Sequence, residues 1–240
     1  MSEMIRANTL LPSKRSPFTL RTADGLGLVG EVASPLGSST GAILCLHPNP
    51  TGGGMMDSHI YRKAANRLPS MAGITVVRFN TRGTTSDAGT SEGVFDNGIG
   101  ERFDVEAALT YCFDELHLTN LWVVGWSFGT DLALHYAKDP RHKGLILLSP
   151  PLKNSSEDQL RYWNEDKRPL IALIPEFDDY LKPHEARERF SVIPHIELIA
   201  VDGAKHLWVG EPSVYRVLSE IVKRVAPEKL PLPTEIADTV

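Results

Sequence analysis

The feature of the sequence that most limits its fold is a series of short apolar runs separated by stretches with helical periodicity. Six runs read as buried strands: residues 42–47, 74–79, 121–126, 144–149, 169–175 and 196–201. A strand in which nearly every residue is apolar is typical of a sheet that is covered on both faces. Because such strands alternate with helical patterns, we expect parallel strands joined by right-handed crossovers.

Two more apolar runs, 18–21 and 26–33, flank the turn sequence "ADG" and predict a hairpin. The sequence therefore predicts an α/β fold with a mostly parallel, twisted sheet of about eight strands flanked by helices. Helices are expected at residues 57–68, 101–116, 128–138, 185–190 and 214–225.

The 240 residues suffice for a single α/β domain, with an ordered core expected over about 18–226. The end segments, 1–16 and 227–240, are rich in Pro, Ser, Thr and charge, and we expect them to be poorly ordered or draped over the surface. The polar segment 150–168 has two interpretations, a small cap over the strand ends or an ordinary surface helix.

Charge and composition exclude several classes of function. A net charge of −5 and a pI near 5.9 argue against binding to nucleic acid. No run approaches the ~20 apolar residues that span a bilayer, and the first residues lack the apolar segment of a signal peptide. The two cysteines form neither a disulfide framework nor a metal motif. We expect a cytoplasmic protein that needs no metal and no cofactor and acts on a small molecule.

The sequence "GWSFG" at 125–129 joins a predicted buried strand to a predicted helix. A serine on such a turn stands clear of the sheet at a helix N-terminus, where peptide dipoles favour negative charge. The turn strains the backbone of Ser127, and Gly125 and Gly129 leave space beside it. Ser127 is the predicted nucleophile.

A serine nucleophile needs a base, and the base needs an orienting acid. Asp178 and Asp179 follow the strand at 169–175, and His206 follows the strand at 196–201. Both positions lie beyond the carboxyl ends of strands, where open α/β sheets place their sites. We predict a triad of Ser127, Asp178 and His206. Asp179 is the alternative acid.

Other polar residues have simpler interpretations. Asp202 reads as a turn residue before Gly203. Six histidines lack a matching acid and are predicted to lie on the surface: His59, His117, His135, His142, His184 and His195. The loop at 80–98 lacks the known phosphate-binding motifs, so Arg82 and Asp87 are expected to support the site.

The loop "HPNPTGGG" at 47–54 is the predicted source of an oxyanion-binding group. An oxyanion hole needs two backbone N–H donors, and the residue after the nucleophile, Phe128, supplies one. Pro48 and Pro50 have no N–H, so Asn49 between them is the expected second donor. His47 reads as a structural histidine that orients the turn.

Four apolar side chains in or beside these loops are candidates for an acyl pocket, with core packing as the alternative for each aromatic ring. These predicted substrate-binding residues are Trp126, Trp163, Trp208 and Met55.

Together, "GWSFG", "EFDDYLKP" (176–183), "GAKH" (203–206) and the His-Pro loop resemble the α/β-hydrolase superfamily over about residues 18–226. The resemblance is narrower to small, nearly lidless bacterial serine hydrolases close to the dienelactone-hydrolase-like and short-acyl esterase groups. The commoner form of that family has a second histidine where Asn49 stands and a glycine where Pro175 stands. Dienelactone hydrolases proper use a cysteine nucleophile, so Ser127 argues against that activity.

The expected function is a serine hydrolase, carboxylesterase-like, that cleaves a small carboxylic ester or related acyl bond through an acyl-enzyme on Ser127. Three alternatives stay open: an acyltransferase, a peptidase or thioesterase with the same triad, and a non-catalytic binding protein on a hydrolase fold.

Overall fold

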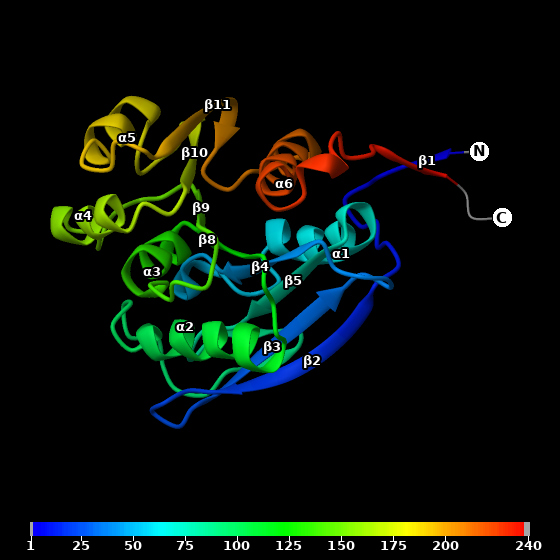
Figure 1. Ribbon diagram of the computed structural model, residues 1–240, viewed down its shortest axis with the longest axis horizontal. Helices are drawn as coiled ribbons and strands as arrows, with labels where there is room; N and C mark the ends of the chain where they lie inside the picture. Colours follow the sequence, from blue (N-terminus) through cyan, green and yellow to red (C-terminus); the bar gives the residue numbers. More distant parts are fainter. Residues whose placement is uncertain (1, 238–240) are drawn as a thin grey trace.

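A twisted sheet of eight strands forms the centre of the computed structural model, which describes residues 2–237 (Figure 1). The strands lie in the order β11-β10-β9-β8-β4-β5-β3-β2. Their bounds are β2 Lys14–Arg21, β3 Gly27–Ser34, β4 Gly41–Leu46, β5 Ile74–Phe79, β8 Leu121–Trp126, β9 Leu145–Leu148, β10 Leu170–Phe177 and β11 Glu197–Lys205. All neighbours from β5 through β4 to β11 are parallel, and β3 alone runs in the opposite direction, antiparallel to both β5 and β2. The predicted fold class is confirmed.

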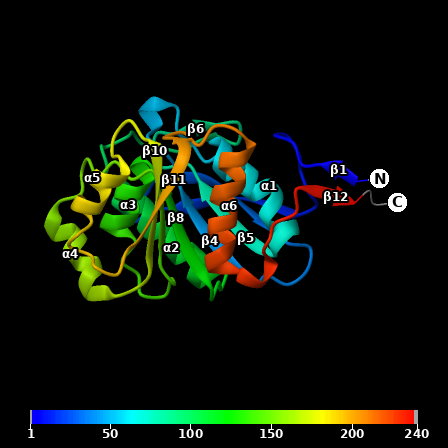
Figure 2. The same ribbon diagram turned by 90° about the horizontal axis from the view of Figure 1, so that it is seen from above.

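Helices cover both faces of the sheet (Figure 2). Helices α1 (His59–Ala72) and α6 (Glu211–Val225) lie on one face. The other face is covered by α2 (Glu101–Thr110), α3 (Phe128–Tyr136), α4 (Glu157–Asp166) and α5 (Pro183–Arg189). After α2 the chain continues into one π-helical turn, Tyr111–Glu115. Helix α6 buries an apolar stripe formed by Val214, Val217, Leu218, Ile221 and Val225.

The order of the strands determines where a site can form. From β4 the chain passes through α1 to β5 on one side, and from there through α2 to β8 on the other side of β4. The loops that leave the carboxyl ends of β4 and β8 therefore diverge. In open α/β sheets such a divergence opens a crevice in which ligands bind. The loop 47–58 after β4 includes the short 3₁₀ helix Pro50–Gly52, and Ser127 follows β8.

The end segments, predicted to be poorly ordered or draped over the surface, pair with each other where the structure describes them. Strand β1 (Ser2–Met4) pairs antiparallel with β12 (Glu235–Ala237), and the two ends leave the body side by side in Figures 1 and 2. Leu232 is buried, and the hydroxyl of Tyr215 donates to its carbonyl oxygen. Strand β2 corresponds to the predicted run 18–21 but begins earlier, at Lys14. Met1 and residues 238–240 lie outside the described residues.

The segment 150–168 forms a helix of the outer layer. Trp163 of α4 is fully buried, and its indole N–H donates to the carbonyl oxygen of Leu134 in α3. The helix thus packs beside α3, as the surface-helix interpretation expects. Only the loop before it, 149–156, reaches toward the strand ends.

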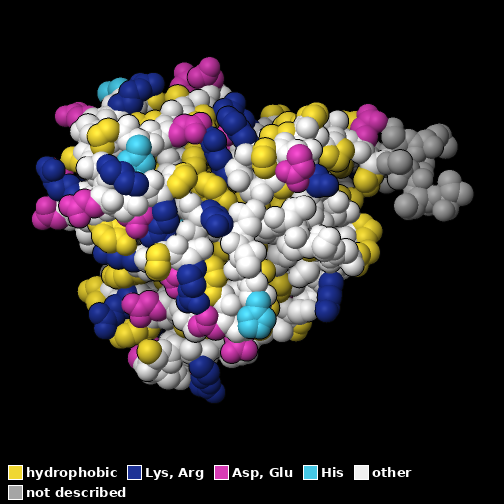
Figure 3. Space-filling view, in the orientation of Figure 1, with side chains coloured by type: hydrophobic (Ala, Val, Ile, Leu, Met, Phe, Trp, Pro, Cys, Tyr) yellow, Lys and Arg dark blue, Asp and Glu magenta, His cyan; other side chains and the backbone are white. Residues whose placement is uncertain are grey.

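The outer surface mixes both signs of charge. Figure 3 shows Lys and Arg side chains interspersed with Asp and Glu over the visible face. Among residues 2–237, no helix combines the length and the apolar character that a membrane span requires.

Candidate active site

Ser127 lies on a strained turn between β8 and α3. Its φ of 52° and ψ of −120° belong to a region that non-glycine residues rarely adopt. The neighbouring glycines make this turn possible because the chain passes very close to them. A Cβ on Gly129 would lie 2.0 Å from the carbonyl oxygen of Leu46, and one on Gly125 would lie 2.5 Å from that of Gly129. The spacing "GWSFG" is therefore required by packing.

The structure brings the three predicted triad residues together. The Nε2 atom of His206 lies 2.9 Å from Ser127 Oγ, and its Nδ1 atom lies 2.9 Å from Asp178 Oδ2. In this arrangement Nδ1–H donates to the carboxylate, so the unprotonated Nε2 faces the hydroxyl. A serine held against an imidazole that is oriented by a buried acid has the geometry of nucleophilic catalysis.

Asp178 is held ionised by its surroundings. The residue is only 3% exposed, and this burial acts to raise the pKa of its carboxyl. The hydrogen bond with His206 and those from the Tyr180 and Leu181 amides to Oδ1, at 2.8 and 3.2 Å, outweigh the burial and lower the pKa below its ordinary value. Asp179 is exposed, and within residues 2–237 His206 Nδ1 bonds to Asp178.

The backbone carbonyl of His206 is fixed by two side chains from other strands. The indole N–H of Trp126 donates to it at 3.2 Å, and the hydroxyl of Ser149 donates at 3.1 Å. The ring of Tyr180 packs edge-on against the imidazole, with centroids 4.6 Å apart. These contacts set the position of His206 from both its backbone and its ring.

The loop after β4 presents Asn49 next to the nucleophile. Asn49 and Phe128 line the same cavity as Ser127, and neither N–H has an acceptor within residues 2–237. The loop is closed by Gly54, where a Cβ would lie 2.1 Å from the carbonyl oxygen of Pro48. The side chain of Asn49 turns back to accept from the backbone and hydroxyl of Thr51.

His47 is a buried structural residue. Its Nε2 accepts from the Thr81 N–H at 3.0 Å, so the ring proton is on Nδ1, which donates to the carbonyl of Pro48 at 2.7 Å. Complete burial lowers the pKa of His47 to about 4. The neutral ring therefore ties the loop after β4 to the loop after β5.

Beside Ser127 lies a cavity of about 240 Å³. It is lined by Asn49, Phe95, Asn97, Ser127, Phe128, Asp131, Pro151, Lys153, Asn154 and Tyr180. Asn49, Ser127 and Phe128 were predicted site residues, whereas the other lining residues were not, because a loop sequence does not say which of its side chains turn inward. Asp131 could have been predicted to lie near the nucleophile, because it follows Ser127 by one helical turn on α3.

The four predicted substrate-binding residues do not line this cavity, so the prediction of an acyl pocket formed by them is wrong. Trp163 and Trp208 are fully buried, and Trp126 is 2% exposed. Trp163 fills the space between α3 and α4, while Trp126 and Trp208 pack on the opposite face with α1 and α6. Met55 is half-buried in the loop after β4, outside the lining. Large rings near site motifs serve the core because both faces of the sheet must be covered.

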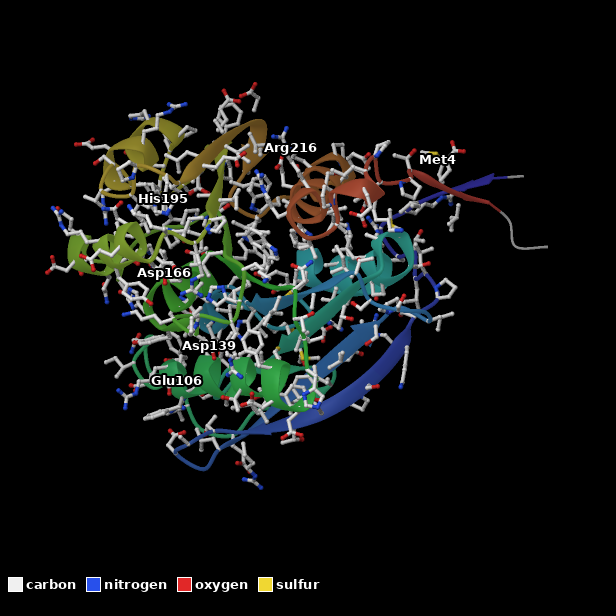
Figure 4. The ribbon with its side chains drawn as sticks, in the orientation of Figure 1. Met4, Glu106, Asp139, Asp166, His195 and Arg216 are labelled. Carbon is white, nitrogen blue, oxygen red and sulfur yellow. The ribbon has the colours of Figure 1, made fainter. Side chains whose placement is uncertain are left out.

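Of the six histidines predicted to lie on the surface, three are exposed, two are half-buried and His142 is buried. His195, labelled in Figure 4, is exposed, as are His117 and His184. His142 is only 1% exposed and bonds to the carbonyl of Ala137, and burial lowers its pKa to about 4. His59 and His135 are half-buried.

Neither of the two residues expected to support the site from the loop 80–98, Arg82 and Asp87, lines the cavity. Arg82 is buried in the same loop. Its guanidinium bonds to the buried Asp104 and to Asp24, while Asp87 is exposed. The same loop carries the small hairpin of β6 (Thr85–Ser86) and β7 (Gly89–Thr90).

No group of three or more His, Cys, Asp or Glu side chains within the described residues is arranged to hold a metal ion. Cys45 and Cys112 are both buried and unpaired.

The sequence pattern of the family described as "alpha/beta hydrolase fold" matches residues 41–207. The chain belongs to this family. The match runs from the start of β4 to the residue after His206, so it includes all three triad positions and Asn49.

One curated relative, the uncharacterized protein RP471 of Rickettsia prowazekii, is 32% identical over 125 residues, which are 51% of this chain. The chain spans about half the length of that relative, since the match covers 50% of it.

Solved structures of similar fold include an alpha-beta serine hydrolase homologue from Coxiella burnetii, with a TM-score of 0.73 and 23% identity over 88% of this chain and 97% of that one. A serine hydrolase without a lid from Xanthomonas campestris, XC6422, has a TM-score of 0.72 and 24% identity over 94% and 100%. The esterase Pf2001 of Pyrococcus furiosus has a TM-score of 0.72 and 21% identity over 89% and 93%. At these identities the likeness establishes the fold.

Proposed function

We propose that this α/β-hydrolase-family protein is a serine esterase that cleaves a small carboxylic ester through an acyl-enzyme on Ser127. The observation that carries the proposal is the hydrogen-bonded chain from Ser127 Oγ through His206 to Asp178, with both distances at 2.9 Å. The names of two proteins of similar fold, a serine hydrolase homologue and an esterase, support the same class.

In the proposed reaction, Ser127 Oγ attacks the ester carbonyl while His206 Nε2 takes its proton. The tetrahedral intermediate then collapses, and the imidazolium returns the proton to the leaving alcohol. A water molecule repeats the sequence on the acyl-enzyme, with His206 again as base, and releases the acid. The ionised Asp178 stabilises the imidazolium that forms in each half of the reaction.

The N–H groups of Asn49 and Phe128 are the proposed oxyanion donors. Both line the cavity at Ser127, and α3 begins at Phe128, so its peptide dipoles add to the stabilisation of negative charge. This role uses only the backbone of Asn49, because its side-chain oxygen is occupied by Thr51.

The size of the cavity indicates a short acyl group. At about 240 Å³ it is smaller than the roughly 300–1,000 Å³ of pockets that hold drug-sized ligands. We expect acetyl and butyryl esters to be turned over much faster than octanoyl or longer esters.

The test is hydrolysis of p-nitrophenyl esters of increasing chain length by the wild type and by Ser127→Ala. The proposal expects highest kcat/KM for the shortest esters and a loss of about 10⁴-fold or more in the variant. A thioester and an anilide of the same acyl group, assayed in parallel, separate an esterase from a thioesterase or amidase. Equal rates for the wild type and Ser127→Ala would refute the proposal.

A further inference from the structure

We propose that the site selects esters that carry a carboxylate, and that Lys153 is the residue that recognises it. This inference rests on the proposed esterase function and names its substrate class. Lys153 lies in the loop 149–156 and lines the cavity together with Ser127. No function above uses its charge.

The Lys153 ammonium is held at the site without a carboxylate partner. It lies 4.4 Å from the centroid of the Tyr180 ring, and that ring packs against His206. Within residues 2–237, no Asp or Glu carboxylate forms an ion pair with it. A cation–π contact fixes the direction of the ammonium but leaves its charge uncompensated. The positive charge is therefore available to an anionic ligand.

The other charged residue of the cavity, Asp131, is engaged by the loop that carries Lys153 and forms no ion pair with Lys153 within residues 2–237. It is 2% exposed, and burial raises the pKa of its carboxyl above the ordinary value. Its Oδ1 accepts from the hydroxyl of Ser155 at 2.6 Å, and the backbone N–H groups of Lys153 and Asn154 also bond to the carboxyl. Asp131 thus fixes the loop that presents Lys153.

Two neutral side chains of the same cavity carry amide N–H donors. The side-chain amides of Asn97 and Asn154 line the cavity and have no hydrogen-bond partner in the described part of the chain. A carboxylate has two acceptor oxygens and no donor, so an ammonium flanked by free amide N–H groups matches it. A cationic ester would leave these donors unsatisfied beside a like charge.

The experiment compares pairs of esters that differ only in charge. Monomethyl succinate and methyl 4-oxopentanoate place the charged or neutral group on the acyl side, whereas acetoxyacetate and acetoxyacetone place it on the alcohol side. The readout is the ratio of kcat/KM for the anionic ester to that for its neutral partner. This ratio is measured in the wild type, in Lys153→Met, in Lys153→Glu and in Lys143→Met. The last variant is the control, because Lys143 is exposed and lies before β9, at the opposite ends of the strands.

We expect the ratio for one pair to fall about fivefold in Lys153→Met, to fall further in Lys153→Glu and to stay unchanged in Lys143→Met. The pair that responds identifies the side of the ester that carries the carboxylate. The wild-type ratio is also expected to fall as salt rises from about 20 to about 500 mM, because salt screens the charge. If both ratios are the same in Lys153→Met and the wild type, the inference is wrong.

Fluorophosphonate labelling of the wild type separates the two possible failures. A labelled protein with unchanged ratios is an esterase without this specificity. An unlabelled protein contradicts the proposed function itself.

Discussion

The indole N–H of Trp126 donates to the carbonyl oxygen of His206 at 3.2 Å, so the residue before the candidate nucleophile holds the candidate base. The residues are 80 positions apart in the sequence. This bond couples strand β8, which is followed directly by Ser127, to the loop that carries His206.

Replacing Trp126 by Phe keeps an aromatic ring but removes the donor to His206. We expect kcat to fall about tenfold with little change in KM, since one neutral hydrogen bond is worth about 1 kcal/mol and its loss displaces the base. Trp122→Phe is the matched control, because Trp122 is a buried tryptophan of the same strand. Steady-state kinetics on p-nitrophenyl acetate measures the effect, and equal losses in both variants would show that the bond has no positioning role.

The two neighbouring aspartates are expected to differ sharply. Asp178→Asn removes the charge that faces His206 Nδ1, and a neutral amide can also favour the wrong tautomer, so kcat should fall by roughly 10³–10⁴-fold. Asp179→Asn changes an exposed side chain and should leave kcat within about twofold. A large loss in Asp179→Asn together with an active Asp178→Asn would transfer the role of the acid to Asp179.

Stability is expected to fall as the solution becomes mildly acidic. Burial lowers the pKa of His47 and of His142 to about 4 in the folded state, whereas an unfolded histidine has a pKa near 6.5. Between these values the unfolded chain binds more protons, so the free energy of unfolding decreases as pH falls from about 6.5 toward 4. Each histidine contributes about 2 kcal/mol to the loss between pH 7 and pH 5.

Urea unfolding of the wild type, His142→Gln and His184→Gln at those two pH values checks this expectation. The decrease should be smaller by about 2 kcal/mol in His142→Gln and unchanged in His184→Gln, which alters an exposed histidine. An identical decrease in His142→Gln and the wild type would mean that His142 does not titrate in this range.

The sheet and the meeting of Ser127, Asp178 and His206 were predictable because each depends on a local pattern. Apolar runs mark strands, and the carboxyl ends of parallel strands bring Ser127, Asp178 and His206 to one edge. The pairing of β1 with β12 had no such signal, since it joins segments more than 230 residues apart in the sequence. A long-range strand pair is set by the whole fold and not by its own sequence.

The lining of the cavity was not predictable for a related reason. Whether Trp163 faces the site or the core depends on how α4 packs against α3. Its buried hydrogen bond to the carbonyl oxygen of Leu134 places the ring in the core. Lys153, Asn97 and Asn154 belong to no sequence motif, and polar side chains are common in loops, so nothing in the sequence singles them out. Their roles become visible only where loops from different strands meet.

The central claim is that Ser127 is an activated nucleophile. Its most direct test is intact-mass and peptide analysis of the wild type and Ser127→Ala after reaction with a fluorophosphonate. The account predicts a single phosphonate adduct on the peptide that contains Ser127 in the wild type and no adduct in Ser127→Ala. An unmodified wild type, or an adduct on a different residue, would contradict it.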